Sequence, residues 1–324
     1  MIFIIKYGII GAGWRSEFYL RTAELLPQEF SVSGIYIRNS EKQKEFAEKY
    51  NVRVCDSLEE LLKTDFDFIV SCVNKDNISG MIKTLAARDI PVLTETPVTD
   101  GTLTGRVQVA EQFHFMPRNQ ACKKIIESGI LGKVHSVKLS CCHDYHAASL
   151  IRFFLDTGFE QPKITSISLT DTITRYNSRT GYLKSPAVIP SEEKIKIFKF
   201  RDKTAVYDFS FEQYFSDIRS SQIIIRGTNG EIVNNTCAYL KDGVPQSLEI
   251  HRNSYGSEES LDGMCLFNIT GGGNVLYTNP FPYSRLSDEE IAIATCLVKM
   301  KEYIDTGKEF YSVKDACFDY ALFE

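Results

Sequence analysis

Apolar and polar residues are most sharply segregated in the first part of the chain. The apolar run over residues 2–10 is typical of a strand that is buried on both faces. The run stops at the Gly-Ala-Gly turn of residues 11–13, and a helical pattern follows as far as Leu26. The sequence therefore predicts a strand, a glycine turn and a helix, in that order.

The alternation of strand and helix continues as far as Pro97. Ser40 with Gln43, and Ser57 with Glu60, have the spacing of capping boxes at the start of helices. Strands that alternate with helices are joined by crossover connections, and such strands are parallel. The predicted strands cover residues 31–37, 52–54, 66–73 and 91–94, and a further helix covers residues 78–85.

Beyond Pro97 the pattern changes to strands that are separated by turns, which favours antiparallel pairing. The predicted fold class is α/β, with a doubly wound parallel sheet of the Rossmann type in residues 1–116. An α/β domain with a large, mostly antiparallel sheet follows in residues 117–324. Its predicted strands cover residues 163–174, 194–200, 204–211, 221–226, 231–234 and 264–270, and helices are predicted at 117–128, 287–303 and 312–322.

Composition and charge narrow the class of protein. The chain has 324 residues, of which 43% are hydrophobic, enough for two cores. A net charge of −5 without any basic run argues against nucleic acid or an anionic membrane as the main partner. No apolar stretch approaches the ~20 residues of a membrane span. Nine cysteines without framework spacing indicate reduced thiols and a cytoplasmic location.

The glycine turn has the residues needed to bind the phosphates of a dinucleotide. Gly11 permits a tight turn, and Gly13 lets a pyrophosphate approach the backbone at the positive end of the helix. Ser16 replaces the third glycine of this fingerprint and is small enough for close packing of helix and strand. Trp14 and Arg15, at the helix opening, are candidates for contact with the same cofactor or for ordinary surface positions.

The end of the second predicted strand favours NADP as the cofactor. NAD-dependent enzymes usually place a carboxylate there, but this chain has Ile37 followed by Arg38 and Asn39. A guanidinium suits the 2′-phosphate that distinguishes NADP from NAD. NADP is therefore the predicted cofactor, and NAD is the alternative. Arg38 could also be an ordinary solvated arginine on a loop, with no role in cofactor binding.

Further candidates follow the central strands, because open α/β sheets bind ligands at the carboxyl ends of their strands. Asn74 and Asn77 follow the 66–73 strand, and Glu95 follows the 91–94 strand. Asparagine also forms turns and helix caps, and a loop glutamate can simply be solvated. These three residues are predicted to contact the cofactor.

A second cluster of reactive residue types covers positions 141–146, with the sequence Cys-Cys-His-Asp-Tyr-His. Adjacent cysteines on a strand point to opposite faces of its sheet. No second group of metal-ligand residues supports the cluster. We therefore predict no metal site, and expect a strand end that leads into a helix.

Several segments together resemble the Gfo/Idh/MocA family of nicotinamide-dependent oxidoreductases. The resemblance implies a Rossmann domain followed by an open-faced α/β domain, with activity on hydroxyl groups of sugars, cyclitols and related small molecules. It also implies that Cys72, Val73 and Thr96 lie at the cofactor. The matching segments are residues 8–13, 38–47, Cys72-Val73-Asn74, Glu95-Thr96-Pro97 where the family has E-K-P, 126–134 and 146–155.

The family's catalytic positions are only partly present. The lysine of E-K-P is here Thr96, and the aspartate of its D-x-x-x-H pair is here Cys142, whereas the histidine remains as His146. An imidazole titrates near neutrality and a threonine hydroxyl does not. His146 is therefore the predicted proton-transfer group, with Tyr145 or His143 assisting.

Two functions follow from this pattern. The first is an oxidoreductase that transfers a hydride between NADP(H) and a hydroxyl or carbonyl of a sugar-like or other polyhydroxylated small molecule. The second is a catalytically silent nucleotide-binding sensor or regulator, which the missing lysine and aspartate would fit. Strands that are apolar on both faces, as at residues 223–225, further predict a homodimer or homotetramer built on the C-terminal sheet.

Overall fold

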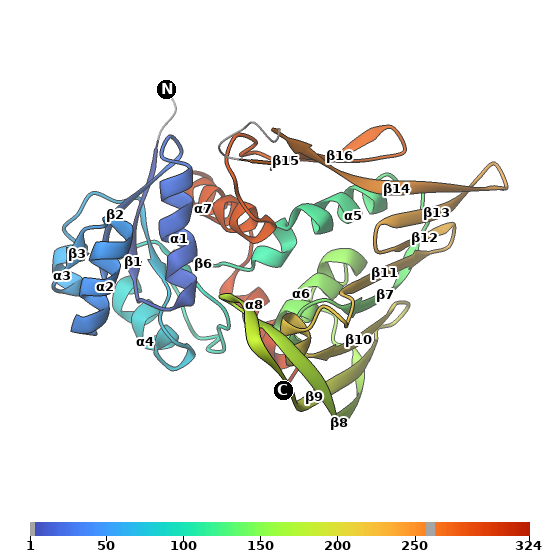
Figure 1. Cartoon of the computed structure of the whole chain (residues 1–324), viewed down its shortest axis with the longest axis horizontal. Coiled ribbons are helices and arrows are strands. Elements are labelled where there is room, and N and C mark those ends of the chain that lie inside the picture. The colour runs from blue at the N-terminus through green and yellow to red at the C-terminus, as the bar shows by residue number, and fades with distance from the viewer. Residues whose placement is uncertain (1–3, 257–262) are drawn as a thin grey trace. The chain divides into compact units, whose positions relative to one another are not determined.

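The N-terminal part of the chain forms a parallel sheet around its first strand. The computed structural model describes residues 4–256 and 263–324, so Ile2 and Phe3 of the predicted first strand lie outside the described residues. Six strands pair in the order β3-β2-β1-β4-β5-β6, the doubly wound order of a Rossmann sheet. They are β1 (Ile5–Ile10), β2 (Phe30–Tyr36), β3 (Val54–Cys55), β4 (Phe68–Ser71), β5 (Val92–Thr94) and β6 (Val107–Val109). Figure 1 labels β1, β2, β3 and β6 of this sheet.

Both faces of this sheet are buried, which explains why its strands read as continuous apolar runs. On one face Tyr7 donates a hydrogen bond from its hydroxyl to the carbonyl of Tyr19 in the first helix. On the other face Ile10 joins an apolar cluster with Ile78 and Ile82. The helices of this part are α1 (Trp14–Leu25), α2 (Ser40–Tyr50), α3 (Leu58–Leu61) and α4 (Lys75–Ala86), and a 3-10 helix, η1, covers Gln112–Phe115.

Helix α2 is capped differently from the prediction. The cap is Asn39, whose side chain accepts hydrogen bonds from the backbone amides of Glu41 and Lys42. Ser40 is the first helical residue, because an Asn at the preceding position satisfies the same orphan amides. At α3 the predicted cap is confirmed, since the Ser57 hydroxyl accepts from the amide of Glu60.

Two C-terminal helices belong to the same compact unit as the parallel sheet. Helix α7 (Asp288–Thr306) contacts α1 and β1 and is buried along most of its first three turns. Helix α8 (Val313–Ala321) packs on β6 and begins at the predicted capping box of Ser312 and Asp315, which is confirmed. This first unit comprises Met1–Asn119, Asn253–Asn268 and Thr278–Glu324.

The predicted division into residues 1–116 and 117–324 makes the two units consecutive stretches of chain. In the structure they are not consecutive, because the chain returns to the first unit after the second. The second unit comprises Gln120–Arg252 and Ile269–Tyr277. The apolar stretch 291–297 of α7 is largely buried, and the contacts of the helix with α1 and β1 contribute to that burial. The change in strand pattern marks where the second unit begins, but it does not show that later segments, including α7, belong to the first unit.

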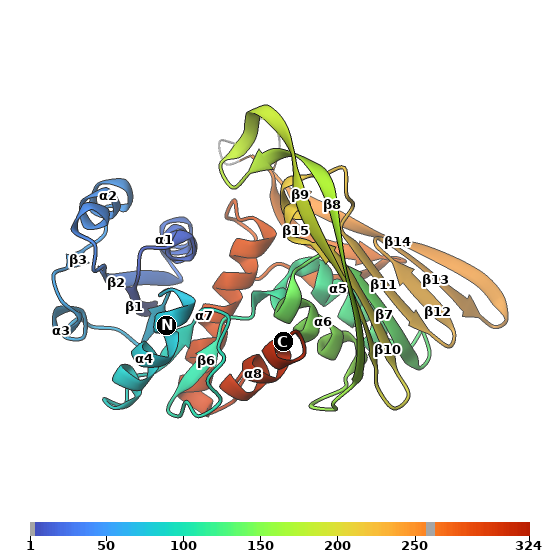
Figure 2. The same cartoon turned by 90° about the horizontal axis from the view of Figure 1, so that it is seen from below.

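The second sheet is large and mostly antiparallel, as predicted. Its ten strands have the order β16-β15-β14-β13-β12-β11-β7-β10-β9-β8. Helices α5 (Pro117–Glu127) and α6 (Asp144–Leu155) lie against one of its faces (Figure 2). The strands are β7 (Val134–Ser140), β8 (Lys163–Ser178), β9 (Gly181–Lys199), β10 (Thr204–Ser210), β11 (Gln222–Gly227), β12 (Gly230–Val233), β13 (Thr236–Lys241), β14 (Val244–Tyr255), β15 (Cys265–Gly271) and β16 (Asn274–Thr278).

The long β8–β9 hairpin and the strands β13, β14 and β16 go beyond the prediction. The segment 181–193 carries Pro186 and Pro190, which argue against a strand interior. Most of that segment is exposed, so it shows no alternation of apolar and polar residues. Pairing with β8 along nearly its whole length, rather than any local pattern, makes it a strand.

The two faces of the second sheet differ in burial. On the face that carries α5 and α6, Val137, Leu139 and Phe198 are fully buried. On the opposite face, Ile197 of β9 and Val233 of β12 belong to one row of cross-strand neighbours and are 43% and 38% exposed. Other apolar side chains on this open face are Ile167, Leu169 and Leu240.

We expect a second copy of the chain to cover this open face. Burial of apolar surface stabilises an assembly by ~25 cal/mol per Å². In a symmetric dimer the same apolar patch is buried on both copies. Light scattering at micromolar concentration should therefore give a dimer or tetramer. Ile197→Asp should give monomers, whereas Ile218→Asp, a control at a loop side chain that is 70% exposed, should not. A monomeric wild-type protein would contradict the prediction.

Candidate functional site

The glycine turn is held against the end of strand β4. Gly11 has a φ of +110°, a conformation that residues with a side chain rarely adopt. A Cβ at this position would lie 2.6 Å from the carbonyl oxygen of Cys72. The amide of Gly11 donates to the carbonyl of Tyr36, at 3.0 Å. Only glycine can occupy this position, and the turn is tied to both neighbouring strands.

Gly13 is constrained in a different way. Its φ is −82°, which any residue can adopt, and a Cβ there would make only an ordinary contact of 3.8 Å with the Cys72 carbonyl oxygen. Gly13 also precedes α1 without giving it a side-chain cap. The protein's own packing does not require glycine here, and the space beside the helix terminus suits the close approach of an anion.

The twelve residues predicted to contact the cofactor all line one cleft of about 1000 Å³, which lies within the first unit. The predicted residues in its wall are Gly11, Gly13, Trp14, Arg15, Arg38, Asn39, Cys72, Val73, Asn74, Asn77, Glu95 and Thr96. The wall also contains Lys42, Lys75 and Asp76, so it carries four basic and two acidic side chains. That excess of positive charge suits an anionic ligand, although the chain as a whole is acidic.

Arg38 and Lys42 are the basic residues at the end of β2. Within the described part of the chain, the exposed guanidinium of Arg38 has no hydrogen-bond or ion-pair partner. The ammonium of Lys42 donates to the carbonyl of Ala12 in the glycine turn, at 3.2 Å. The sequence analysis missed Lys42, although its position four residues after Arg38, near the start of a helix, was an available signal.

Arg15 is tied to two carboxylates. Its Nε lies 3.0 Å from Oε2 of Glu95, and its Nη1 lies 2.6 Å from Oε1 of Glu289 in α7. Burial disfavours the charged guanidinium, but the two carboxylates outweigh this and raise the pKa of Arg15. The other oxygen of Glu95 accepts a hydrogen bond from the hydroxyl of Tyr19. Arg15 and Glu95 thus form part of the cleft wall as a neutralised pair.

A buried carboxyl group lies in the same unit. Glu111 is fully buried just before η1 and accepts a hydrogen bond from the amide of Phe113, at 3.2 Å. Burial raises the pKa of Glu111 to about 7, although His114 and Arg15 oppose that rise. The side chain therefore titrates near neutrality, unlike an ordinary glutamate.

The predicted catalytic residues lie together at the start of α6, in the second unit. His143 precedes the helix, and Tyr214 holds it, since the Tyr214 hydroxyl accepts from the His143 amide at 3.0 Å and lies 3.2 Å from its Nδ1. The rings of His143 and His146 are 5.0 Å apart, and those of Tyr145 and His146 are 4.4 Å apart. His146 is only 5% exposed and is the third residue of the helix.

Asp144, the first residue of α6, adds charged groups that the sequence analysis missed. Its amide donates to the hydroxyl of Tyr207 at 3.1 Å, and its carboxylate lies 3.4 Å from the ammonium of Lys194 on β9. Lys194 opens the predicted strand 194–200, but it is distant from Asp144 in sequence, and no local pattern predicts that the two side chains pair. The cluster therefore contains a lysine and an aspartate beside the histidines.

The expected orientation of the two adjacent cysteines is wrong. Strand β7 ends at Ser140, and Cys141 and Cys142 lie in a bend rather than on opposite faces of a strand. Their sulfur atoms are 3.8 Å apart, with the Cys141 thiol donating to Cys142. Within residues 4–256 and 263–324, no three His, Cys, Asp or Glu side chains are grouped as metal ligands.

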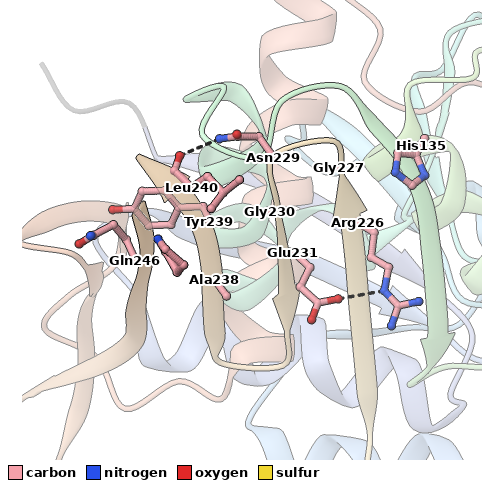
Figure 3. A pocket seen from close by; sticks show the side chains of 11 residues that line it. His135, Arg226, Gly227, Asn229, Gly230, Glu231, Ala238, Tyr239, Leu240 and Gln246 are labelled. Atoms are coloured by element: carbon pink, nitrogen blue, oxygen red, sulfur yellow. Dashed lines mark hydrogen bonds and ion pairs between the residues drawn. The ribbon is translucent and has the colours of Figure 1, made fainter. Parts of the chain in front are cut away.

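A second, shallower hollow of about 440 Å³ lies on the large sheet (Figure 3). Arg226 and Glu231 form an ion pair across neighbouring strands at 2.9 Å, and His135 lies on the next strand. The amide group of Asn229 donates to the carbonyl of Leu240. The hollow includes none of the predicted site residues.

Comparison with known families identifies the first domain. Residues 5–114 match the model of an oxidoreductase family with an NAD-binding Rossmann fold, GFO_IDH_MocA. The N-terminal domain belongs to the Gfo/Idh/MocA oxidoreductase family. No curated protein matches the chain in sequence. Among the described residues, no helix has the length and apolar character needed to cross a bilayer.

The likeness in fold to solved structures extends over nearly the whole chain. An Agrobacterium radiobacter oxidoreductase in complex with NAD+, L-tartaric acid and magnesium has a TM-score of 0.66 at 14% identity, covering 99% of this chain and 94% of that one. The transcriptional regulator Gal80p of Kluyveromyces lactis gives 0.65 at 13%, with 99% and 91% covered. Synechocystis biliverdin reductase, in complex with biliverdin and NADP+, gives 0.60 at 12%, with 98% and 96% covered. Such low identities establish the fold alone.

The raised pKa of Glu111 predicts a pH dependence of stability. The folded state favours the protonated carboxyl, so this contribution is complete below the ordinary pKa of 4.5 and is lost as pH rises through about 7. The loss is roughly 3 kcal/mol at ~1.36 kcal/mol per pKa unit. Denaturant unfolding from pH 4.5 to 8 should show Glu111→Gln losing less stability than the wild type. The exposed Glu127→Gln control should follow the wild type, and a parallel course for Glu111→Gln would contradict the prediction.

Proposed function

We propose that the chain is an NADP(H)-dependent oxidoreductase that interconverts a hydroxyl and a carbonyl group on a sugar-like or other polyhydroxylated small molecule. The observation that carries the proposal is the uncapped start of α1 beside Gly13, in a cleft whose basic groups exceed its acidic ones. Nicotinamide supplies or accepts the hydride when it is bound. The protein's share is to hold the cofactor, orient the substrate and move a proton.

The choice of NADP rests on the end of β2. The pocket wall there carries Arg38 and Lys42 but no carboxylate to bind ribose hydroxyls. Arg38 has its guanidinium free for a bidentate contact with a 2′-phosphate, within the described residues. Lys42, already placed on the glycine turn, adds a second positive charge close by.

Proton transfer is assigned to His146 in the second unit. The half-buried hydroxyl of Thr96 cannot titrate near neutrality, whereas a neutral imidazole can accept the hydroxyl proton during oxidation and return it during reduction. The pair of Asp144 and Lys194 supports an active enzyme, because it supplies an aspartate and a lysine in the cluster where the family's usual positions lack them. Tyr145 and His143 assist by packing against the same ring.

The cofactor assignment predicts a measurable preference. NADPH should bind about one to two decades more tightly than NADH, because a charge-assisted contact contributes ~1.5–3 kcal/mol. Arg38→Ala should remove the preference in a fluorescence titration. Lys44→Ala, which removes the same charge from an exposed position on α2 outside the cleft wall, should keep it. Equal dissociation constants for the two cofactors in the wild type would rule the assignment out.

The proton-transfer assignment predicts a loss of turnover with binding retained. His146→Ala should lower turnover by roughly 10²–10⁴ and leave the NADPH dissociation constant unchanged. His135→Ala, an exposed histidine on β7, is the matched control and should behave as the wild type. Wild-type turnover and an unchanged pH profile in His146→Ala would move the assignment to His143 or Tyr145.

Single-turnover oxidation of bound NADPH tests the function itself. The wild type should oxidise NADPH with at least one member of a panel of aldoses, ketoses and inososes. Failure across the whole panel, with NADPH binding intact, would favour the alternative of a silent nucleotide-binding sensor or regulator. Failure to bind either cofactor would contradict both functions.

A further inference from the structure

Two thiols lie side by side just before α6. All nine cysteines lie among the described residues and are not bridged, and of these nine only Cys141 and Cys317 are not buried. Cys141 is half-exposed, Cys142 is fully buried, and their sulfur atoms are 3.8 Å apart. Cys317 instead donates to the carbonyl of Val98, at 3.5 Å. Cys141 is thus a reachable thiol with a second sulfur in contact.

We propose that Cys141 and Cys142 form a redox-active dithiol that a hydroperoxide closes into a disulfide. An accessible cysteine next to a resolving cysteine is the arrangement that favours a reversible disulfide over further oxidation. Neither thiol is used in the proposed hydride transfer. The proposal therefore stands whether or not the chain is an oxidoreductase of the proposed class.

The reaction balances with the hydroperoxide as the sole oxidant. The Cys141 sulfur attacks the peroxide oxygen, the O–O bond breaks, and an alcohol (water, for hydrogen peroxide) leaves as Cys141 becomes a sulfenic acid. The Cys142 sulfur then attacks the Cys141 sulfur, the S–O bond breaks, and water leaves. The two thiols lose two electrons and two protons, and the peroxide gains them.

The disulfide would be easy to reduce again. Consecutive Cα atoms are ~3.8 Å apart across a trans peptide, which is shorter than the usual range of ~4.4–6.8 Å between bridged cysteines. Bridges outside that range are strained and more readily reduced. A reversible modification is the expected result.

The position of the pair joins it to the histidine cluster. Cys142 is followed directly by His143, which the Tyr214 hydroxyl contacts. The same hydroxyl holds both the amide and the ring of His143. Closing the bridge turns the backbone that leads directly into His143, so the oxidised form changes the cluster that contains His146.

Peptide mapping of the full-length protein tests the proposal. Trypsin releases residues 139–152 as one peptide that contains both cysteines and no other, and residues 315–324 as a second that contains Cys317. After hydrogen peroxide at one molar equivalent and alkylation with N-ethylmaleimide, most of the first peptide should be two hydrogens lighter and unalkylated. The second should remain fully alkylated, and glutathione should restore alkylation of the first.

Variants separate the roles of the two sulfurs. Cys142→Ala should leave Cys141 to proceed to sulfenic and sulfinic acid, and Cys141→Ser should leave the peptide unoxidised. The wild-type map decides the matter even if a variant fails to fold. Two alkylated cysteines in residues 139–152, at a peroxide level that oxidises glutathione, would overturn the proposal. Sulfinic acid at Cys141 beside an alkylated Cys142 in the wild type would overturn it equally.

Discussion

The contact between the glycine turn and the carboxyl end of β4 is the constraint on which the cleft depends. Gly11 lies so close to the carbonyl of Cys72 that no side chain fits between them, and its φ of +110° also favours glycine. This fixes the point at which α1 begins. Gly13 is consequently left beside the helix terminus without packing that requires glycine, which is what a phosphate group needs from a backbone.

The charge of the cleft wall then decides which ligands it suits. Glu95 is neutralised by Arg15 and also accepts a hydrogen bond from a tyrosine hydroxyl, so the remaining charged groups at the wall are mainly cations. The second ion pair of Arg15, with Glu289, ties the C-terminal helix α7 to the start of α1. One guanidinium therefore joins the first turn of α1 to a residue 274 positions later, and the positive end of α1 stays fixed in place.

Much of the first unit could be predicted from sequence, because its strands are short, buried on both faces and separated by helices. The cleft residues followed from the same logic, since parallel strands end at one edge of the sheet. Three features could not be predicted, because each depends on distant partners: the placement of α7, the strand character of residues 181–193, and Lys194 beside Asp144. The contact between Cys141 and Cys142 was also missed. Adjacent side chains point to opposite faces only on a strand, and β7 ends at Ser140, before both cysteines.

Titration of Gly13→Ala with NADPH tests the central claim, that the start of α1 is a cradle for the cofactor's pyrophosphate. A Cβ there makes only an ordinary contact within the protein, so the melting temperature should match that of the wild type. The same Cβ would occupy the space that a phosphate must enter, so the account predicts at least a tenfold loss of NADPH affinity. Wild-type affinity in a variant of wild-type stability would show that the cofactor does not bind at this turn.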